Sequence, residues 1–124
     1  MLKKLRKIIV GGESYLWRYR YDDYDYCLPS YLLILPEKDR GNEIRIKFPL
    51  IDKPIEKFML NMGFKELKNG EEVLINLNEP KYVVEFLHYL FDTNKVDFSK
   101  KKRYSFEYGE ELLNEMGYVF KWKI

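Results

Sequence analysis

The chain has one histidine and one cysteine, and both are residue types that can do chemistry. His88 has Glu85 three residues before it and Asp92 four residues after it, so on a helix a carboxylate could orient its imidazole as a general base. The same spacing is typical of a surface histidine in a local ion pair. We favour that interpretation because no nucleophile accompanies His88 in a known motif. Cys27 follows two aspartates, whose negative charge disfavours the reactive thiolate. We therefore predict no catalytic residue and keep an enzyme of unrecognised type as an alternative.

Carboxylates and tyrosines alternate in one short segment, which consists of Asp22, Asp23, Tyr24, Asp25 and Tyr26. Oxygen-rich loops can bind Ca²⁺, but the ligand offsets, central glycine and distal glutamate of an EF-hand are missing here. Tyrosine supplies contact area and aspartate supplies charge, a combination that suits a basic protein surface. A solvated loop is the plain interpretation of this segment. The functional hypothesis is a site for a protein partner.

Basic residues gather on the first strands and in a second run near the C-terminus. Tyr104 and Phe106 follow the second run and could stack on bases while the basic side chains contact phosphates. The motifs of the common nucleic-acid-binding modules are absent, and a short basic run is usually a solvated loop. Nucleic-acid binding is therefore the alternative to protein binding, through Arg18, Arg20, Lys100, Lys101, Lys102 and Arg103.

Composition limits the class of protein. The chain has 124 residues, of which 46% are hydrophobic and 34% charged, and its net charge is +2. These values predict one compact domain over residues 1–124 and do not by themselves indicate a nucleic-acid partner. A single cysteine excludes an internal disulfide, and the apolar runs are too short for a signal peptide or a membrane span. We therefore expect a cytoplasmic protein. Residues with A/T-rich codons dominate, so we expect its source to be a low-GC bacterium.

The elements that would position these residues begin with a hairpin. Tyr15, Trp17, Tyr19 and Tyr21 alternate with other residues, which predicts one face of a strand. Residues 5–10 are the expected partner strand, across a turn at Gly11-Gly12. The aromatic stripe is either core or an exposed patch that needs a partner.

Further strands follow the same two signals, alternation and turn residues. Residues 31–35 form a continuous apolar run, typical of a buried strand, and Ile44, Ile46 and Phe48 alternate with charged residues. Residues 64–68 and 73–77 flank Asn69-Gly70, the strongest short hairpin signal. Strands are also expected at 104–107 and 118–124.

Helices are predicted at 52–62, at 80–92 and at 109–116. Asp52 is a candidate N-cap for the first, Asn78 or Glu79 for the second, and glycines end the first and third. The order predicts an α+β domain: an antiparallel sheet built from hairpins, with two or three short helices on one face. No motif predicts a cofactor or a metal. Our hypothesis is a non-catalytic protein-binding module of the immunity or regulatory type, which is a monomer or a homodimer.

Overall fold

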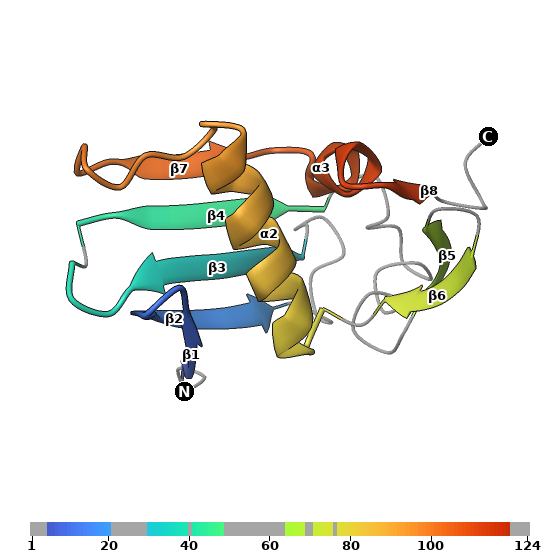
Figure 1. The fold of residues 1–124 in the computed structure, drawn as a ribbon, viewed down its shortest axis with the longest axis horizontal. Helices are drawn as coiled ribbons and strands as arrows, with labels where there is room; N and C mark the ends of the chain where they lie inside the picture. Colours follow the sequence, from blue (N-terminus) through green and yellow to red (C-terminus); the bar gives the residue numbers. More distant parts are fainter. Residues whose placement is uncertain are drawn as a thin grey trace.

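The structure is a computed structural model, and it describes residues 5–20, 30–39, 41–48, 64–68, 71–75 and 77–119. For residues 64–68, 71–75 and 119 it describes the backbone alone. Within these residues the chain forms a five-stranded sheet, a three-stranded sheet and two helices (Figure 1). The predicted α+β class is therefore confirmed. The helix expected at 52–62 lies outside the described residues.

The large sheet has the strand order β1-β2-β3-β4-β7. The first four strands follow one another along the chain and pair antiparallel. The turn between the first two strands is the one that the sequence predicts: Gly11 and Gly12 have φ of 60° and 83°, as a tight hairpin turn requires. The strands are β1 (Arg6–Val10), β2 (Glu13–Arg20), β3 (Tyr31–Pro36), β4 (Glu43–Lys47) and β7 (Arg103–Phe106).

The last strand of this sheet departs from the prediction. β7 runs parallel to β4, with Ile44 opposite Tyr104 and Ile46 opposite Phe106. Parallel neighbours need a crossover connection, and here the chain crosses through helix α2 (Pro80–Asp92) before it returns to the sheet. The prediction of an antiparallel sheet made only of hairpins is therefore wrong at this edge.

One face of the large sheet packs against α2, which lies across it in Figure 1. Cross-strand partners share a face, and the row Trp17, Ile34, Ile44 is buried in the same cluster as the apolar side of the helix. That side consists of Tyr82, Val83, Phe86, Leu87 and Leu90. Burial of each such side chain contributes roughly 1.5–3 kcal/mol. Tyr15 and Tyr19 are buried there too, so the aromatic stripe is core as far as the structure describes it; Tyr21 lies outside the described residues.

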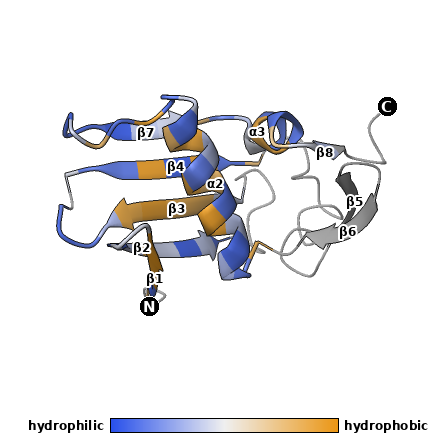
Figure 2. Ribbon diagram, in the orientation of Figure 1, coloured by the Kyte–Doolittle hydropathy of each residue, from blue (hydrophilic) through white to orange (hydrophobic). Residues whose placement is uncertain are grey.

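The central strand is apolar on both faces. β3 is coloured hydrophobic along nearly its whole length in Figure 2, whereas β4 alternates. Leu32 and Ile34 face α2, while Leu33 and Leu35 join Leu16 in a second, smaller cluster on the other face. The continuous apolar run predicted a buried strand, and that prediction is confirmed.

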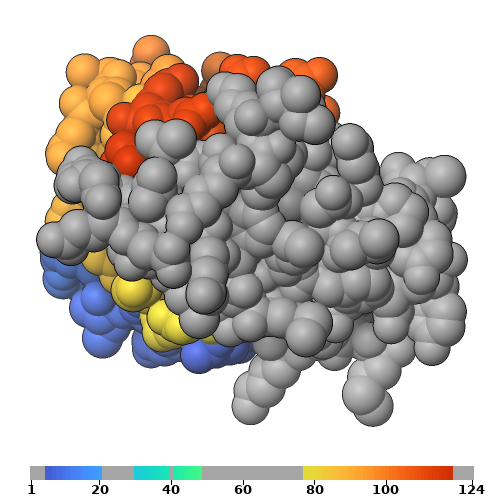
Figure 3. Space-filling model, turned by 90° about the vertical axis from the view of Figure 1, so that its right-hand side faces the viewer, coloured from blue at the N-terminus to red at the C-terminus, as the bar shows by residue number. Residues whose placement is uncertain are grey.

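The segment that enters α2 packs against the first hairpin. The guanidinium of Arg6 lies 4.5 Å over the Trp17 ring, and its Nη1 donates to the carbonyl oxygen of Asn78 at 2.5 Å. In the view of Figure 3, the yellow atoms at the start of the α2 segment lie beside the blue atoms of the first strands. Glu79 is the N-cap residue but makes no side-chain capping bond, and Pro80 starts the helix as expected.

The second sheet has the order β6-β5-β8, with strands β5 (Phe64–Lys68), β6 (Glu71–Ile75) and β8 (Tyr118–Val119). β5 and β6 pair antiparallel, which confirms that the two predicted strands are partners, but β6 begins and ends two residues before the predicted 73–77. The turn residues Asn69 and Gly70 lie outside the described residues. β8 is described only to Val119, and the rest of the predicted C-terminal strand lies outside the described residues.

Helix α3 (Gly109–Glu115) occupies the predicted third helix, and Gly117 follows it with a φ of 103°. A glycine at that angle ends a helix at little cost, as the sequence indicated. Helix α2 ends similarly at Asn94, whose φ is 58°. Both helix ends therefore agree with the prediction to within a residue or two.

Candidate binding surfaces

The acidic and aromatic segment at Asp22, Asp23, Tyr24, Asp25 and Tyr26 lies outside the described residues, as does Cys27. The hypothesis that this segment contacts a protein partner therefore stays a prediction.

The basic residues of β2 lie on the face of the large sheet that is turned away from α2. Arg18 and Arg20 alternate with Trp17 and Tyr19, which point into the core beneath the helix. Successive side chains of a strand point to opposite faces, so both arginines project from the other side. The structure thus gives two of the residues predicted from the sequence a common face.

Two further strands add cations to that face. Arg18 is opposite Leu33, which is opposite Arg45, and Arg20 is opposite Tyr31, which is opposite Lys47. Neighbouring strands are about 4.8 Å apart, so the backbones of the two cations in each row are about 10 Å apart. Arg103 of β7 is opposite Glu43 and shares the same face. We call these five residues the basic face: Arg18, Arg20, Arg45, Lys47 and Arg103.

Two acidic residues contact cations of the basic face. Lys47 Nζ is 3.3 Å from Glu107 Oε1, and Arg45 Nε is 3.8 Å from Glu43 Oε2. Ser105 Oγ also donates to Glu107 at 2.6 Å, and this bond, followed by the Lys47 contact, lowers the pKa of the Glu107 carboxyl. Exposed pairs of this kind contribute little stability, and a stronger anion can displace the carboxylates. The Arg45 guanidinium lies 4.8 Å over the Tyr31 ring.

The lysines of the second basic run lie at the end of the sheet where β4 and β7 begin. Lys100, Lys101 and Lys102 are exposed in the loop that follows α2. The Lys102 amide donates to Asn42 Oδ1 at 2.8 Å, and its ammonium lies 5.1 Å from the centre of the Tyr104 ring. Of the run, Arg103 alone projects from the strand face shared with Arg18. Sequence reasoning missed Arg45 and Lys47, which it interpreted only as the polar side of a half-buried strand.

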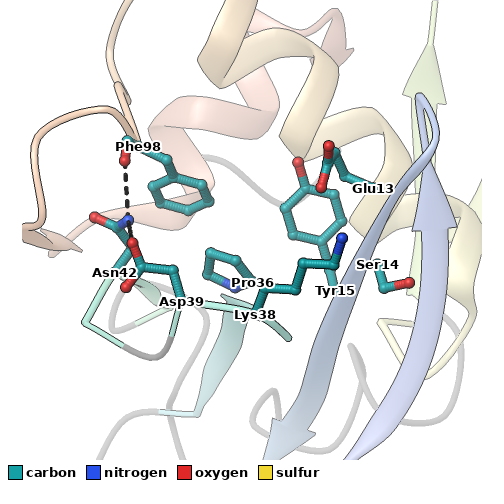
Figure 4. A pocket seen from close by; sticks show the side chains of 8 residues that line it. All are labelled: Glu13, Ser14, Tyr15, Pro36, Lys38, Asp39, Asn42 and Phe98. Carbon is teal, nitrogen blue, oxygen red and sulfur yellow. Dashed lines mark hydrogen bonds between the residues drawn. The ribbon is translucent and has the colours of Figure 1, made fainter.

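A pocket of about 200 Å³ lies at the same end of the sheet (Figure 4). The rings of Tyr15 and Phe98 form facing sides of it, with centroids 6.4 Å apart, and the Lys38 side chain runs past Pro36 between them. We call it the sheet-end pocket, and its lining residues are Glu13, Ser14, Tyr15, Pro36, Lys38, Asp39, Asn42 and Phe98. The sequence singled out Tyr15 alone, as part of the aromatic stripe, because the lining residues come from three stretches that are distant in the chain.

Asn42 holds the wall of this pocket together. It is 1% exposed, and its Nδ2 donates to Asp39 Oδ2 at 3.2 Å and to the Phe98 carbonyl oxygen at 2.9 Å. Its Oδ1 accepts from the Lys102 amide at 2.8 Å. One buried side chain therefore ties the turn between β3 and β4 to the loop between α2 and β7. Burial and the charge of Glu13 raise the pKa of the Tyr15 hydroxyl, so the phenol stays protonated in the pocket.

His88 is exposed on α2, as the surface interpretation predicted, but no ion pair joins it to Glu85 or Asp92 within the described residues. It borders a shallow hollow of about 290 Å³ with Val84, Glu85, Tyr89 and Met116. Glu85 accepts a hydrogen bond from Tyr118 Oη at 2.7 Å, and Glu115 accepts one from Tyr89 Oη. These carboxylates therefore connect α2 to the end of α3 and do not orient the imidazole.

In the described part of the chain, no three histidine, cysteine or acidic side chains are grouped so that they could hold a metal ion. Neither of the described helices is long and apolar enough to cross a membrane. Comparison with protein-family models, curated proteins and solved structures gives no match to this chain. The geometry of its own surfaces is therefore the basis for a functional proposal.

Proposed function

We propose that this protein binds single-stranded nucleic acid on the basic face. The observation that carries the proposal is the alignment of five cations on one side of strands β2, β4 and β7: Arg18, Arg20, Arg45, Lys47 and Arg103. Only Glu43 among the residues of β2, β3, β4 and β7 on that side carries a negative charge. A net charge of +2 for the whole chain hides this asymmetry.

An aromatic side chain in the same row as two of the cations supports the choice of a single strand over a duplex. Tyr31 lies between Arg20 and Lys47 in its row and already carries the Arg45 guanidinium on its ring. Proteins that bind single strands combine a basic track with aromatic rings on which bases stack, and a sheet is one platform for this. The exposed Lys100, Lys101 and Lys102 would extend the track beyond the start of β7.

The test is fluorescence anisotropy with a labelled oligothymidylate and a labelled oligouridylate over a range of salt concentrations. Five phosphate contacts, those of the basic face alone, predict a slope of log affinity against log salt of about −3.5, which is roughly a 100-fold loss between 50 and 200 mM salt, and contacts from the lysine run would steepen it. The double variant Arg20→Gln/Arg103→Gln should reduce this slope to about −2. Both arginines are exposed, so the variant should fold.

The matched control is Lys81→Gln/Lys95→Gln, which removes the same charge from exposed positions on and just after α2. This control should keep the slope of the native protein. Equal losses in the two double variants would mean that binding follows net charge alone, and no binding at low salt would contradict the proposal outright. A stoichiometric protein that copurifies with the chain, in the absence of nucleic-acid binding, would favour the protein-binding hypothesis instead.

We propose the cytoplasm as the place where this binding occurs, since a single cysteine gives no disulfide framework suited to an oxidising compartment. The assays therefore belong in reducing buffer. Whether the chain is a monomer or a homodimer affects the number of phosphates contacted, so the anisotropy measurements need a parallel sedimentation measurement of mass.

A further inference from the structure

The sheet-end pocket has a wall that is organised before any ligand arrives. Both carboxylate oxygens of Asp39 are engaged, Oδ1 by the Gly41 amide at 3.1 Å and Oδ2 by the Asn42 side chain at 3.2 Å. Asn42 in turn fixes the loop that carries Phe98. The Phe98 ring packs on Phe91 at 5.5 Å and on Tyr104 at 6.4 Å between centroids. Small-molecule sites are usually preformed in this way, with an apolar lining and few polar groups.

Four polar side chains of the pocket have no side-chain hydrogen bond or ion pair within the described residues. They are the carboxylate of Glu13, the hydroxyls of Ser14 and Tyr15 and the ammonium of Lys38, and all four line the pocket. Glu13 and Lys38 carry opposite charges at the ends of neighbouring strands, yet no ion pair joins them. Even if Glu13 and Lys38 formed an ion pair, an exposed pair would contribute little stability, and a ligand could displace it easily.

We propose that the sheet-end pocket binds a small zwitterion, an α-amino acid with an apolar or aromatic side chain. Its ammonium group would contact Glu13 and the Tyr15 oxygen, and its carboxylate would contact Lys38. Its side chain would lie against Phe98 and Pro36. The pocket volume of about 200 Å³ suits a ligand of this size.

Other ligand classes fit the same groups less well. A phosphate would face the carboxylates of Glu13 and Asp39 with one lysine to balance them. A metal ion would meet the ammonium of Lys38, and within the described residues no group of three metal ligands is present. A ligand with one charge of each sign matches one free carboxylate and one free ammonium, and charge-assisted hydrogen bonds at both ends would fix its orientation.

The test is a titration of the ¹⁵N-labelled protein, followed by the amide resonances, with each protein amino acid in turn. Pocket amides, among them those of Glu13, Ser14 and Lys38, should shift. For the aromatic case the matched probes are L-phenylalanine, phenethylamine and 3-phenylpropionate, of which the last two each lack one charge. L-phenylalanine should bind at least about tenfold more tightly than either analogue, since each analogue loses one charge-assisted contact.

Two variants then assign the two ends of the ligand. Glu13→Gln should abolish the preference for L-phenylalanine over 3-phenylpropionate, and Lys38→Met should abolish the preference over phenethylamine. Both side chains are exposed, so both variants should fold. Glu111→Gln and Lys81→Met make the same charge changes at exposed sites on α3 and α2 and should leave the preferences unchanged.

Three results would overturn the proposal. The first is that no amino acid shifts the pocket amides. The second is that phenethylamine or 3-phenylpropionate binds as tightly as L-phenylalanine, which would indicate a site for one charge only. The third is that the shifts map to another surface. None of these outcomes bears on nucleic-acid binding, because the pocket shares no residue with the basic face.

Discussion

A single buried amide, Asn42, connects two turns that are distant in sequence. Its side chain makes all three of its hydrogen bonds to groups in the turn after β3 and in the loop after α2, at 2.8 to 3.2 Å. Truncation would leave the Lys102 amide and the Phe98 carbonyl without a protein partner, and a buried polar group left unpaired costs about 1–3 kcal/mol.

We therefore expect Asn42→Ala to lower the free energy of unfolding by about 3 kcal/mol. Urea unfolding followed by circular dichroism measures this loss. Asn114→Ala is the control, because that residue is half-buried on α3 and makes no side-chain hydrogen bond within the described residues, and its change should stay within about 0.5 kcal/mol. A small effect of Asn42→Ala would show that water replaces these bonds in full.

Two tyrosines, Tyr89 and Tyr118, connect α2 to the last described residues of the chain. They predict that the folded protein loses stability at alkaline pH. The hydrogen bond to Glu115 raises the pKa of Tyr89 to about 12, and burial followed by the Glu85 bond raises the pKa of Tyr118 as well. A group whose folded pKa lies above its unfolded value of about 10 adds stability that is complete below pH 10. That contribution is lost as the pH rises through the folded value.

The stability of the native protein should consequently fall between about pH 10 and pH 12, and Tyr89→Phe should lessen the fall. The measurement is the urea midpoint at several pH values for both proteins. Glu115→Gln is a useful second variant, since it keeps an acceptor but removes the charge. A stability difference between the native protein and Tyr89→Phe that stayed constant from pH 9 to pH 12 would rule out this linkage.

At the scale of elements, the first residue of α3 lies so close to the sheet that it leaves no room for a side chain. A methyl group at Gly109 would collide with the Phe48 ring and would lie 2.6 Å from Ile46 Cγ2. Both of these residues are fully buried in the core. The first residue of α3 is thus a contact point between the helix and the end of β4.

This contact predicts that Gly109→Ala destabilises the protein by about 1–3 kcal/mol through overpacking. The sign of this change in stability tests the contact, because an alanine normally stabilises a helix by about 1 kcal/mol relative to glycine. Thermal or urea unfolding measures the change. A gain in stability would mean that α3 does not lie against β4 in solution.

Local signals in the sequence predict elements better than they predict neighbours. The two glycine turns at Gly11-Gly12 and Asn69-Gly70 specify hairpins because the required backbone angles are local. The parallel pairing of β7 with β4 depends on a crossover through α2, and no residue near β7 encodes it. The assumption that every strand pairs with its neighbour in a hairpin therefore predicted the wrong direction for β7.

The same reasoning explains what the sequence indicated about the binding surfaces. Arg18 and Arg20 could be predicted as one strand face from their alternation with aromatic residues, whereas their grouping with Arg45 and Lys47 depends on strand order. The sheet-end pocket combines residues near positions 14, 38 and 98, which only the tertiary fold brings together. Its polar residues are also common surface types, so nothing local distinguishes them.

For the whole molecule, the question is whether the two sheets unfold as one unit. Tyr118 connects the small sheet to the main core, because its backbone pairs with Lys68 of β5 while its side chain is 2% exposed in that core. Its ring lies 6.2 Å from that of Tyr82, and its hydroxyl donates to Glu85 on α2. A residue in this position should couple the small sheet to the large one.

If residues 1–124 form one cooperative domain, Tyr118→Ala should lower the opening free energies of the β3 and β5 amides by the same amount. The expected loss is about 3–5 kcal/mol for a truncated buried aromatic side chain. Tyr118→Phe, which keeps the ring, should cost about 1 kcal/mol in both strands. Native-state hydrogen exchange measures each strand separately. A loss confined to β5, with β3 unchanged, would instead define the small sheet as an independent unit docked on a larger one.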